Sequence, residues 1–128
     1  MDEKQKIKSF TDLVAWKEGH ALVLMIYAAT KEFPKEEQFA LTTQLRRAGV
    51  SITSNIAEGF SRNTRKEKIQ FYRTAIGSLT EVQNQLLIAR DVGYIGKERF
   101  AEIFSKTVTV SKLLHGLVKS AEGFPHNT

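Results

Sequence analysis

The stretch from Gln44 to Lys68 limits the possible folds more than any other, because its apolar residues recur with the period of an α-helix. At about 3.6 residues per turn, one stripe of this helix is aliphatic and would face a core: Leu41, Leu45, Ala48, Ile52 and Ile56. No side chain between Ala48 and Ala57 is charged. A helix on the surface of a monomer normally shows charge toward solvent, so we expect this helix to be covered on more than one side.

Four helices joined by short links are predicted along the chain. The first runs from about Leu13 to Glu32, and the second, which carries the aliphatic stripe, runs from Lys35 to Glu58 with Gly59 as its left-handed C-terminal cap. The third begins at Thr64 with the pattern of a capping box, and the fourth spans Lys97 to Ala121. No stretch alternates with the period of two that marks a strand. The expected fold class is therefore all-α, an antiparallel up-and-down four-helix bundle in a single domain.

The composition sets further bounds. We expect a flexible N-terminal arm over 1–9, the bundle over 10–122 and a frayed tail over 123–128. The chain has no cysteine, which excludes disulfides and thiolate chemistry. The longest uncharged apolar run, Ala21 to Ala29, is much shorter than the roughly 20 residues of a membrane span, and the polar N-terminus does not show the apolar core of a signal peptide. These features predict a cytoplasmic protein without a membrane partner.

The first helix is apolar on two opposite faces, which is difficult to bury inside one small bundle. One face carries Leu13, Trp16, His20, Leu24 and Tyr27, with His20 expected as a hydrogen-bonded core or interface residue. Self-association is the simplest way to cover the second face, together with the uncharged part of the second helix. The predicted oligomer interface comprises Ala15, Leu22, Ile26, Ala29, Val50, Ser51, Ser54, Asn55 and Ala57.

The sequence offers no convincing catalytic centre. None of the three histidines has a glutamate three residues before it, so the paired ligands of di-iron bundles are absent. A helical ribonuclease would need an arginine about one turn from a histidine on a late helix, and the six residues before His115 contain none. We predict no enzyme activity, no catalytic residue, no metal, no cofactor and no small-molecule substrate.

Positive charge is concentrated around the link between the second and third helices. The predicted nucleic-acid-binding residues are Arg46, Arg47, Arg62, Arg65, Lys66, Lys68 and Arg73. Against them stand only Glu58 and Glu67, and the local surplus of five equals the formal net charge of +5 of the whole chain. Phosphate contacts need such local density, and arginine binds phosphate in a bidentate manner. The alternative is a solvated turn that keeps the protein soluble, and the charge alone does not decide between the two.

Several runs resemble the bacterial four helix bundle protein family, also described as the 23S rRNA intervening-sequence proteins. They are FTDLVAWKEGHALVLMIYAATKEFP, LTTQLRRAGVSITSNIAEGFSR and KEKIQFYRTAIGSLTEVQNQL, within a resemblance that covers Phe10 to Ile95. The signature QLRRAxxSIxxNIAEG is specific, and A-x-GSLxE from Ala75 to Glu81 reinforces it. Many members have proline where this chain has Thr53, and a proline there would kink the second helix.

The resemblance implies an antiparallel four-helix bundle that forms ring-like homopentamers. It also suggests a relationship to the accessory protein of diversity-generating retroelements, which binds nucleic acid. Five chains would carry a formal charge of about +25, and avidity would strengthen each weak patch. The expected function is a non-enzymatic oligomer, with a pentamer favoured, that binds RNA or DNA, structured RNA such as rRNA above all. The alternative is a protein–protein assembly subunit with no nucleic-acid partner. The family lends its signature residues no established catalytic role.

Overall fold

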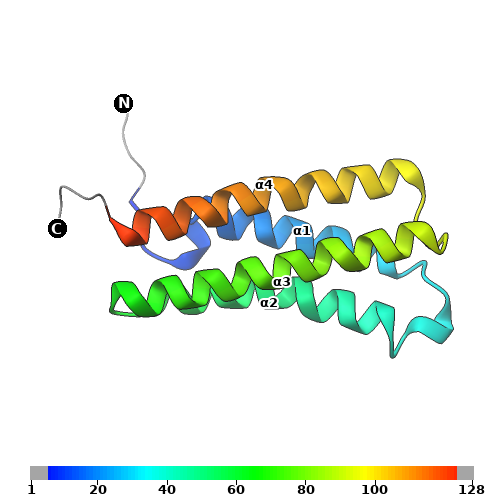
Figure 1. Cartoon of the computed structure of the whole chain (residues 1–128), viewed down its shortest axis with the longest axis horizontal. Helices are drawn as coiled ribbons and strands as arrows, with labels where there is room; N and C mark the ends of the chain where they lie inside the picture. The colour runs from blue at the N-terminus through cyan, green and yellow to red at the C-terminus, as the bar shows by residue number, and fades with distance from the viewer. Residues whose placement is uncertain (1–5, 124–128) are drawn as a thin grey trace.

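The computed structural model describes residues 6–123, which form four helices (Figure 1). Their bounds are α1 Val14–Thr30, α2 Leu41–Ser61, α3 Arg65–Asp91 and α4 Lys97–Glu122. Two short 3-10 turns, η1 Phe10–Asp12 and η2 Lys35–Glu37, precede α1 and α2. No strand occurs within these residues. The predicted arm and tail fall largely on 1–5 and 124–128, which lie outside the described part of the chain.

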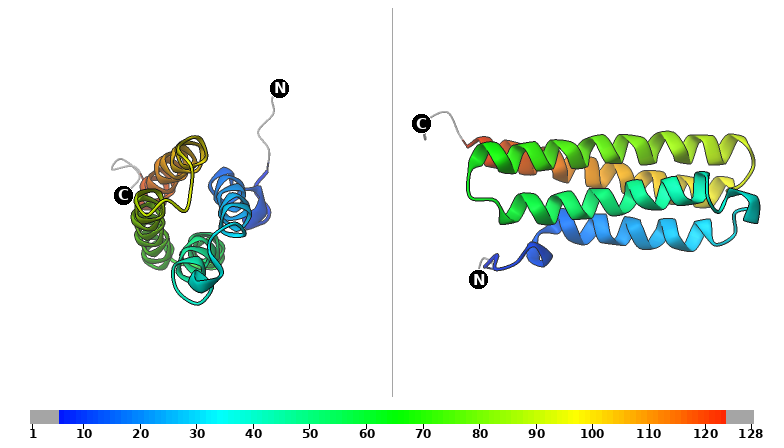
Figure 2. Two further views of the ribbon diagram at one scale, coloured as in Figure 1. Left: turned by 90° about the vertical axis from the view of Figure 1, so that its right-hand side faces the viewer. Right: turned by 90° about the horizontal axis from the view of Figure 1, so that it is seen from below.

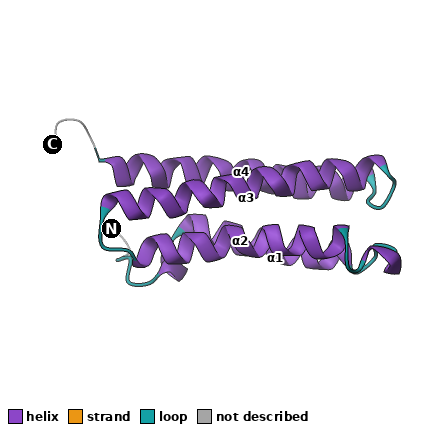
Figure 3. Cartoon of the chain, turned by 60° about the horizontal axis from the view of Figure 1, so that its bottom comes forward, coloured by secondary structure: helices purple, strands orange, loops and turns teal. Residues whose placement is uncertain are grey.

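The helices run alternately up and down, and each packs against two neighbours (Figures 2 and 3). α1 contacts α2 and α4, and α3 contacts the same two helices, so the bundle is square in cross-section with the diagonal pairs apart. This arrangement confirms the predicted fold class. It also places the α2–α3 turn, the segment before α1 and the end of α4 at one end of the bundle (Figure 2, right).

The core consists of one aliphatic stripe from each helix. Its largest side chains with less than 2% exposure include Leu22, Ile26, Leu45, Ile52, Ile56, Leu86, Ile103, Val110 and Leu114. Burying each such side chain contributes about 1.5–3 kcal/mol to folding. The stripe predicted on the second helix lies in this core, with Leu41 alone only partly buried.

The buried and exposed faces of α1 are the reverse of the prediction. Ala15, Leu22, Ile26 and Ala29 are at most 4% exposed and belong to the core of the single chain. The prediction that these four form an interface between copies is therefore wrong. Along the opposite face the exposed His20 stacks on Trp16, with 4.7 Å between ring centroids, so His20 is not a core residue. Both faces are apolar, and periodicity alone does not show which of two apolar faces points inward.

The second helix also differs from its predicted bounds. It begins at Leu41, because Lys35 to Glu37 form the separate turn η2, and it continues past Gly59 to Ser61. Gly59 is therefore a helical residue and not a left-handed cap; among residues 6–123 the positive φ angles belong to Gly93 and Gly123. α2 runs unbroken through Thr53, whose hydroxyl donates to the Val50 carbonyl at 3.1 Å. 

Thr64 is the N-cap of α3, as predicted. Its Oγ1 accepts a hydrogen bond from the Glu67 amide at 3.1 Å, which satisfies one of the free donors of the first turn. Gly59 lies opposite the same part of α3, where a Cβ would stand 2.6 Å from Cε1 of Tyr72. The glycine thus permits a close approach of α2 to α3 just before the turn.

Across residues 6–123, the helices are too short or too polar to cross a lipid bilayer.

Candidate nucleic-acid interface

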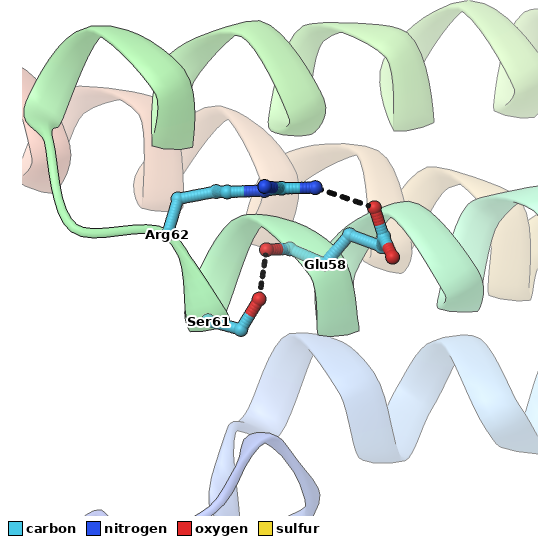
Figure 4. A network of polar contacts seen from close by, with 3 residues as sticks. All are labelled: Glu58, Ser61 and Arg62. Carbon is cyan, nitrogen blue, oxygen red and sulfur yellow. Dashed lines mark hydrogen bonds and ion pairs between the residues drawn. The ribbon is translucent and has the colours of Figure 1, made fainter.

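The α2–α3 turn is a short extended link between two helix ends. Arg62 is the C-cap of α2 in an extended conformation, and its amide donates to the Gly59 carbonyl at 3.2 Å. Figure 4 shows that Arg62 turns back along α2 toward Glu58, while the Ser61 hydroxyl bonds the Glu58 carbonyl at 2.7 Å. These local hydrogen bonds fix the backbone of the turn, and each cationic side chain makes its own separate contacts.

Arg62 is held by two contacts with the bundle. Its Nη2 lies 3.0 Å from Oε1 of Glu58, and its guanidinium lies over the ring of Phe71 at 4.6 Å. Its Nε is buried and has no hydrogen-bond partner within residues 6–123. A guanidinium packed on an aromatic ring contributes to stability through both charge and contact area. Arg62 is thus partly committed to the bundle itself.

Lys68 acts mainly on the end of α2. Its Nζ donates to the Phe60 carbonyl at 2.8 Å and lies 3.4 Å from the Gly59 carbonyl. These are free acceptors at a helix C-terminus, where the helix dipole favours a cation. Lys68 is half-buried, and within residues 6–123 these two contacts use two of the three donors of its Nζ.

Three cations of the turn remain exposed. Arg73 pairs with Glu122 at 3.2 Å, and Arg65 donates to the Glu122 carbonyl at 3.4 Å, which ties α3 to the end of α4. Lys66 is exposed and forms no ion pair or side-chain hydrogen bond within residues 6–123. Exposed pairs of this kind contribute only about 0–1 kcal/mol, so a phosphate group can replace the carboxylate.

Arg46 and Arg47 do not belong to the same patch. They precede Arg62 by about 15 residues of continuous helix, which corresponds to about 23 Å along α2. Arg46 donates to Thr30 at 2.8 Å and lies over the ring of Tyr27 at 4.6 Å. Arg47 is exposed and borders a groove between α2 and α3. The structure therefore separates the seven predicted residues into a pair near the start of α2, toward the opposite end of the bundle, and five at or near the turn.

The structure adds three cations that sequence reasoning missed: Lys6, Lys8 and Lys119. Their chain neighbours Ile7 and Ser120 line the same pocket as Arg65, which places these three lysines near the turn. The antiparallel topology alone could have identified them, since in such a bundle the start of the first helix and the end of the fourth must lie beside the turn between the second and third helices. A search along the sequence for clustered charge does not detect it.

We call this end of the molecule the basic end. Its eight cations are Lys6, Lys8, Arg62, Arg65, Lys66, Lys68, Arg73 and Lys119, against the four carboxylates Asp12, Glu58, Glu67 and Glu122. The opposite end carries six cations and six carboxylates: Lys31, Lys35, Arg46, Arg90, Lys97 and Arg99 with Glu32, Glu36, Glu37, Asp91, Glu98 and Glu102. Positive potential therefore increases along the bundle toward the α2–α3 turn.

The remaining predicted interface residues lie on the exposed side of α2. Val50 and Ser54 are exposed, and Ser51, Asn55 and Ala57 are half-buried. Ser51 is hydrogen-bonded to Ser78 of α3 at 2.7 Å, and Asn55 donates to the Ser51 carbonyl at 2.8 Å. Ser51 and Asn55 thus make hydrogen bonds within the chain. Contact of this exposed side of α2 with another copy stays a prediction.

The groove beside Arg47 contains an unsatisfied polar group. Gln44, Arg47, Ser51, Glu81 and Gln85 line it, and Oε1 of Gln85 is buried without a hydrogen-bond partner in the described residues. Leaving such a group unpaired costs about 1–3 kcal/mol. No cluster of three or more histidine or acidic residues that would hold a metal ion occurs within residues 6–123.

Comparison with known proteins identifies the family. A search of curated proteins gives no match to the chain. A similar solved structure, from Bacteroides thetaiotaomicron VPI-5482, is described as a protein with unknown function from the S23 ribosomal protein family. It superimposes with a TM-score of 0.77 over 83% of this chain and 96% of that one at 24% identity, which supports the same fold. The family described as 23S rRNA-intervening sequence protein matches residues 11–116, and the chain belongs to it.

Proposed function

We propose that the protein binds nucleic acid through the basic end and catalyses no reaction on it. The observation that carries this proposal is the uneven charge of the bundle, eight cations against four carboxylates at one end and six against six at the other. The phosphate backbone attracts such a surface regardless of sequence. The family description, with its reference to 23S rRNA, favours structured RNA as the partner.

The contacts at the basic end suggest how phosphates bind. Lys66 and Arg65 project from the first turn of α3, where the positive end of the helix dipole adds to their charge. Arg73 gives up only an exposed pair with Glu122 on meeting a phosphate. With about three phosphate contacts, affinity would fall about 20- to 40-fold between about 50 and 200 mM salt.

The test is a salt-titrated binding assay with a fluorescently labelled RNA hairpin and the full chain. The variant Arg65→Glu/Lys66→Glu changes the charge at the basic end, and Lys35→Glu/Lys97→Glu makes the same change in net charge at the opposite end. We expect the first variant to lose salt-sensitive binding and the second to keep most of it. Equal effects of the two variants would assign binding to net charge alone, and binding that does not vary with salt would refute the proposal.

A second candidate function, a subunit for protein assembly, is favoured by an apolar patch on α1 and α2. Leu24, Tyr27 and Val50 are 56%, 39% and 40% exposed, and the last two line a pocket of about 430 Å³. The adjacent groove holds the unpaired Gln85 oxygen, which a partner chain would satisfy. These features support contact with a second copy of the chain, and the family resemblance favours a pentamer.

Sedimentation at micromolar concentration tests assembly separately from nucleic-acid binding. We expect an oligomer for the wild-type chain and dissociation for Val50→Asp, since a buried unpaired charge opposes the contact. Val108→Asp, on the exposed side of α4, is the matched control and should leave the mass unchanged. A wild-type monomer would exclude assembly through this patch.

A further inference from the structure

A pocket of about 510 Å³ opens at the basic end. Its apolar walls come from separate segments of the chain, with Ile7 and Leu13 before α1, Phe60 at the end of α2 and Leu117 in α4. The volume falls within the range of about 300–1,000 Å³ that is typical of small-ligand sites. The pocket therefore offers apolar space directly beside the cations of the α2–α3 turn.

Tyr72 supplies a polar group to this pocket. It lines the pocket, yet the residue is only 4% exposed, with its ring packed against Gly59. Within residues 6–123 its hydroxyl makes no hydrogen bond to protein atoms, unlike that of Tyr94, which donates to Glu37 at 2.8 Å, and the Tyr72 oxygen is accessible from the pocket. Burial raises the pKa of Tyr72 above its ordinary value, so the hydroxyl stays protonated at neutral pH. A phenolic hydroxyl both donates and accepts, so an accessible one at the pocket wall can bond a polar edge of a ligand.

Among residues 6–123, two cations line the same pocket and no carboxylate does. Arg65 makes only a long hydrogen bond to the Glu122 carbonyl, at 3.4 Å, and Lys68 is held beside Phe60 by the Phe60 carbonyl. Apolar walls, a hydroxyl and two positive charges together suit a ligand with a flat or apolar body and an attached anion. They do not suit a cationic ligand, which Arg65 and Lys68 would repel.

We propose, resting on the proposed function, that this pocket receives an unpaired nucleobase while Arg65 and Lys68 hold its adjacent phosphate. A base in a duplex is stacked and paired and does not enter such a pocket, whereas an unpaired base is free to lie against Phe60 and to bond the Tyr72 hydroxyl. The protein thereby distinguishes loops, bulges and single strands from continuous duplex. Base identity is not read by this contact alone, since every base offers an apolar face and polar edges.

The test compares three labelled RNAs of equal length and charge with the full chain: a hairpin with an unpaired loop, the same hairpin with abasic loop positions, and a fully paired duplex. We expect the loop hairpin to bind at least about 10-fold more tightly than the other two, in line with the stacking of a single base. Tyr72→Phe removes only the hydroxyl and should weaken loop binding by about 2- to 10-fold without affecting the duplex.

A second variant blocks the pocket. Leu117→Trp fills it and should reduce loop binding to the duplex level, while Val108→Trp on the exposed side of α4 is the matched control. Circular dichroism melting verifies that each variant is folded, and Tyr72→Phe keeps the test valid should Leu117→Trp unfold the bundle.

The outcomes separate this inference from the proposed function. Equal affinity for all three RNAs, with binding still lost in Arg65→Glu/Lys66→Glu, would overturn base insertion and leave phosphate binding intact. Failure of all three RNAs to bind at low salt would overturn both. Binding of a long-chain fatty acid that is lost in Leu117→Trp, together with no preference for the loop, would assign the pocket to another apolar anion and overturn the inference.

Discussion

Replacing Gly59 by alanine tests whether the close approach of α2 and α3 depends on a missing side chain. In the interior of a helix, alanine is ordinarily more favourable than glycine by about 0.5–1 kcal/mol. At Gly59, however, the new Cβ would lie 2.6 and 2.9 Å from two ring carbons of Tyr72 and 3.1 Å from Cβ of Phe71. Tyr72 is 4% exposed, so its ring has little room to move.

Overpacking of this kind costs about 1–3 kcal/mol, which leaves a net destabilisation of about 0–2.5 kcal/mol after the helix gain. Gly77→Ala in α3 is the matched control, because a Cβ there meets nothing within 4 Å. We expect Gly77→Ala to be stabilising by about 0.5–1 kcal/mol. Urea unfolding of both variants measures the difference. If Gly59→Ala is as stable as Gly77→Ala, the contact with Tyr72 does not limit the helix spacing.

Three further predictions concern single contacts. Lys68→Met keeps the apolar stem but removes the hydrogen bond to the Phe60 carbonyl, so urea unfolding should show a loss of about 0.5–1.5 kcal/mol; an unchanged midpoint would show that water replaces the cap. Ser51→Ala leaves the buried Ser78 hydroxyl without its 2.7 Å partner and should cost about 1–2 kcal/mol in the same assay, whereas the exposed control Ser54→Ala should cost less than about 0.5 kcal/mol. The amides of Lys8 and Ser9 hold the pKa of Asp12 below its ordinary value of 3.8, so its stabilisation is present above that pH and is lost as the pH falls through the lower folded-state pKa. Thermal midpoints recorded as a function of pH should therefore fall less steeply in acid for Asp12→Asn than for the wild type, and parallel curves would contradict this role.

Much of the bundle follows from local pattern. The stripe from Leu45 to Ile56 predicted which side of α2 is buried, because the other sides of that helix are more polar. Thr64 was predicted as a cap because its hydroxyl needs only the amide three residues later, a purely local contact. Gly59 was misassigned, since the same residue serves as a left-handed cap or as a point of close helix contact, and the neighbouring helix decides which.

The candidate site was only partly predictable. The sequence indicated the cations from Arg62 to Arg73 because they are neighbours in the chain. It placed Arg46 and Arg47 with them, although a continuous helix carries these two about 23 Å away. It did not include Lys119, which comes to the site only because α4 returns to the same end of the bundle.

The sequence by itself determined the number of helices and the excess of positive charge, because helical periodicity and composition are local properties. The tertiary structure decided which face of α1 is buried, since that depends on where α2 and α4 pack against it. It also decided which cations share a surface and that Tyr72, Arg65 and Ile7 line one pocket, because residues distant in the chain meet only when the helices are antiparallel.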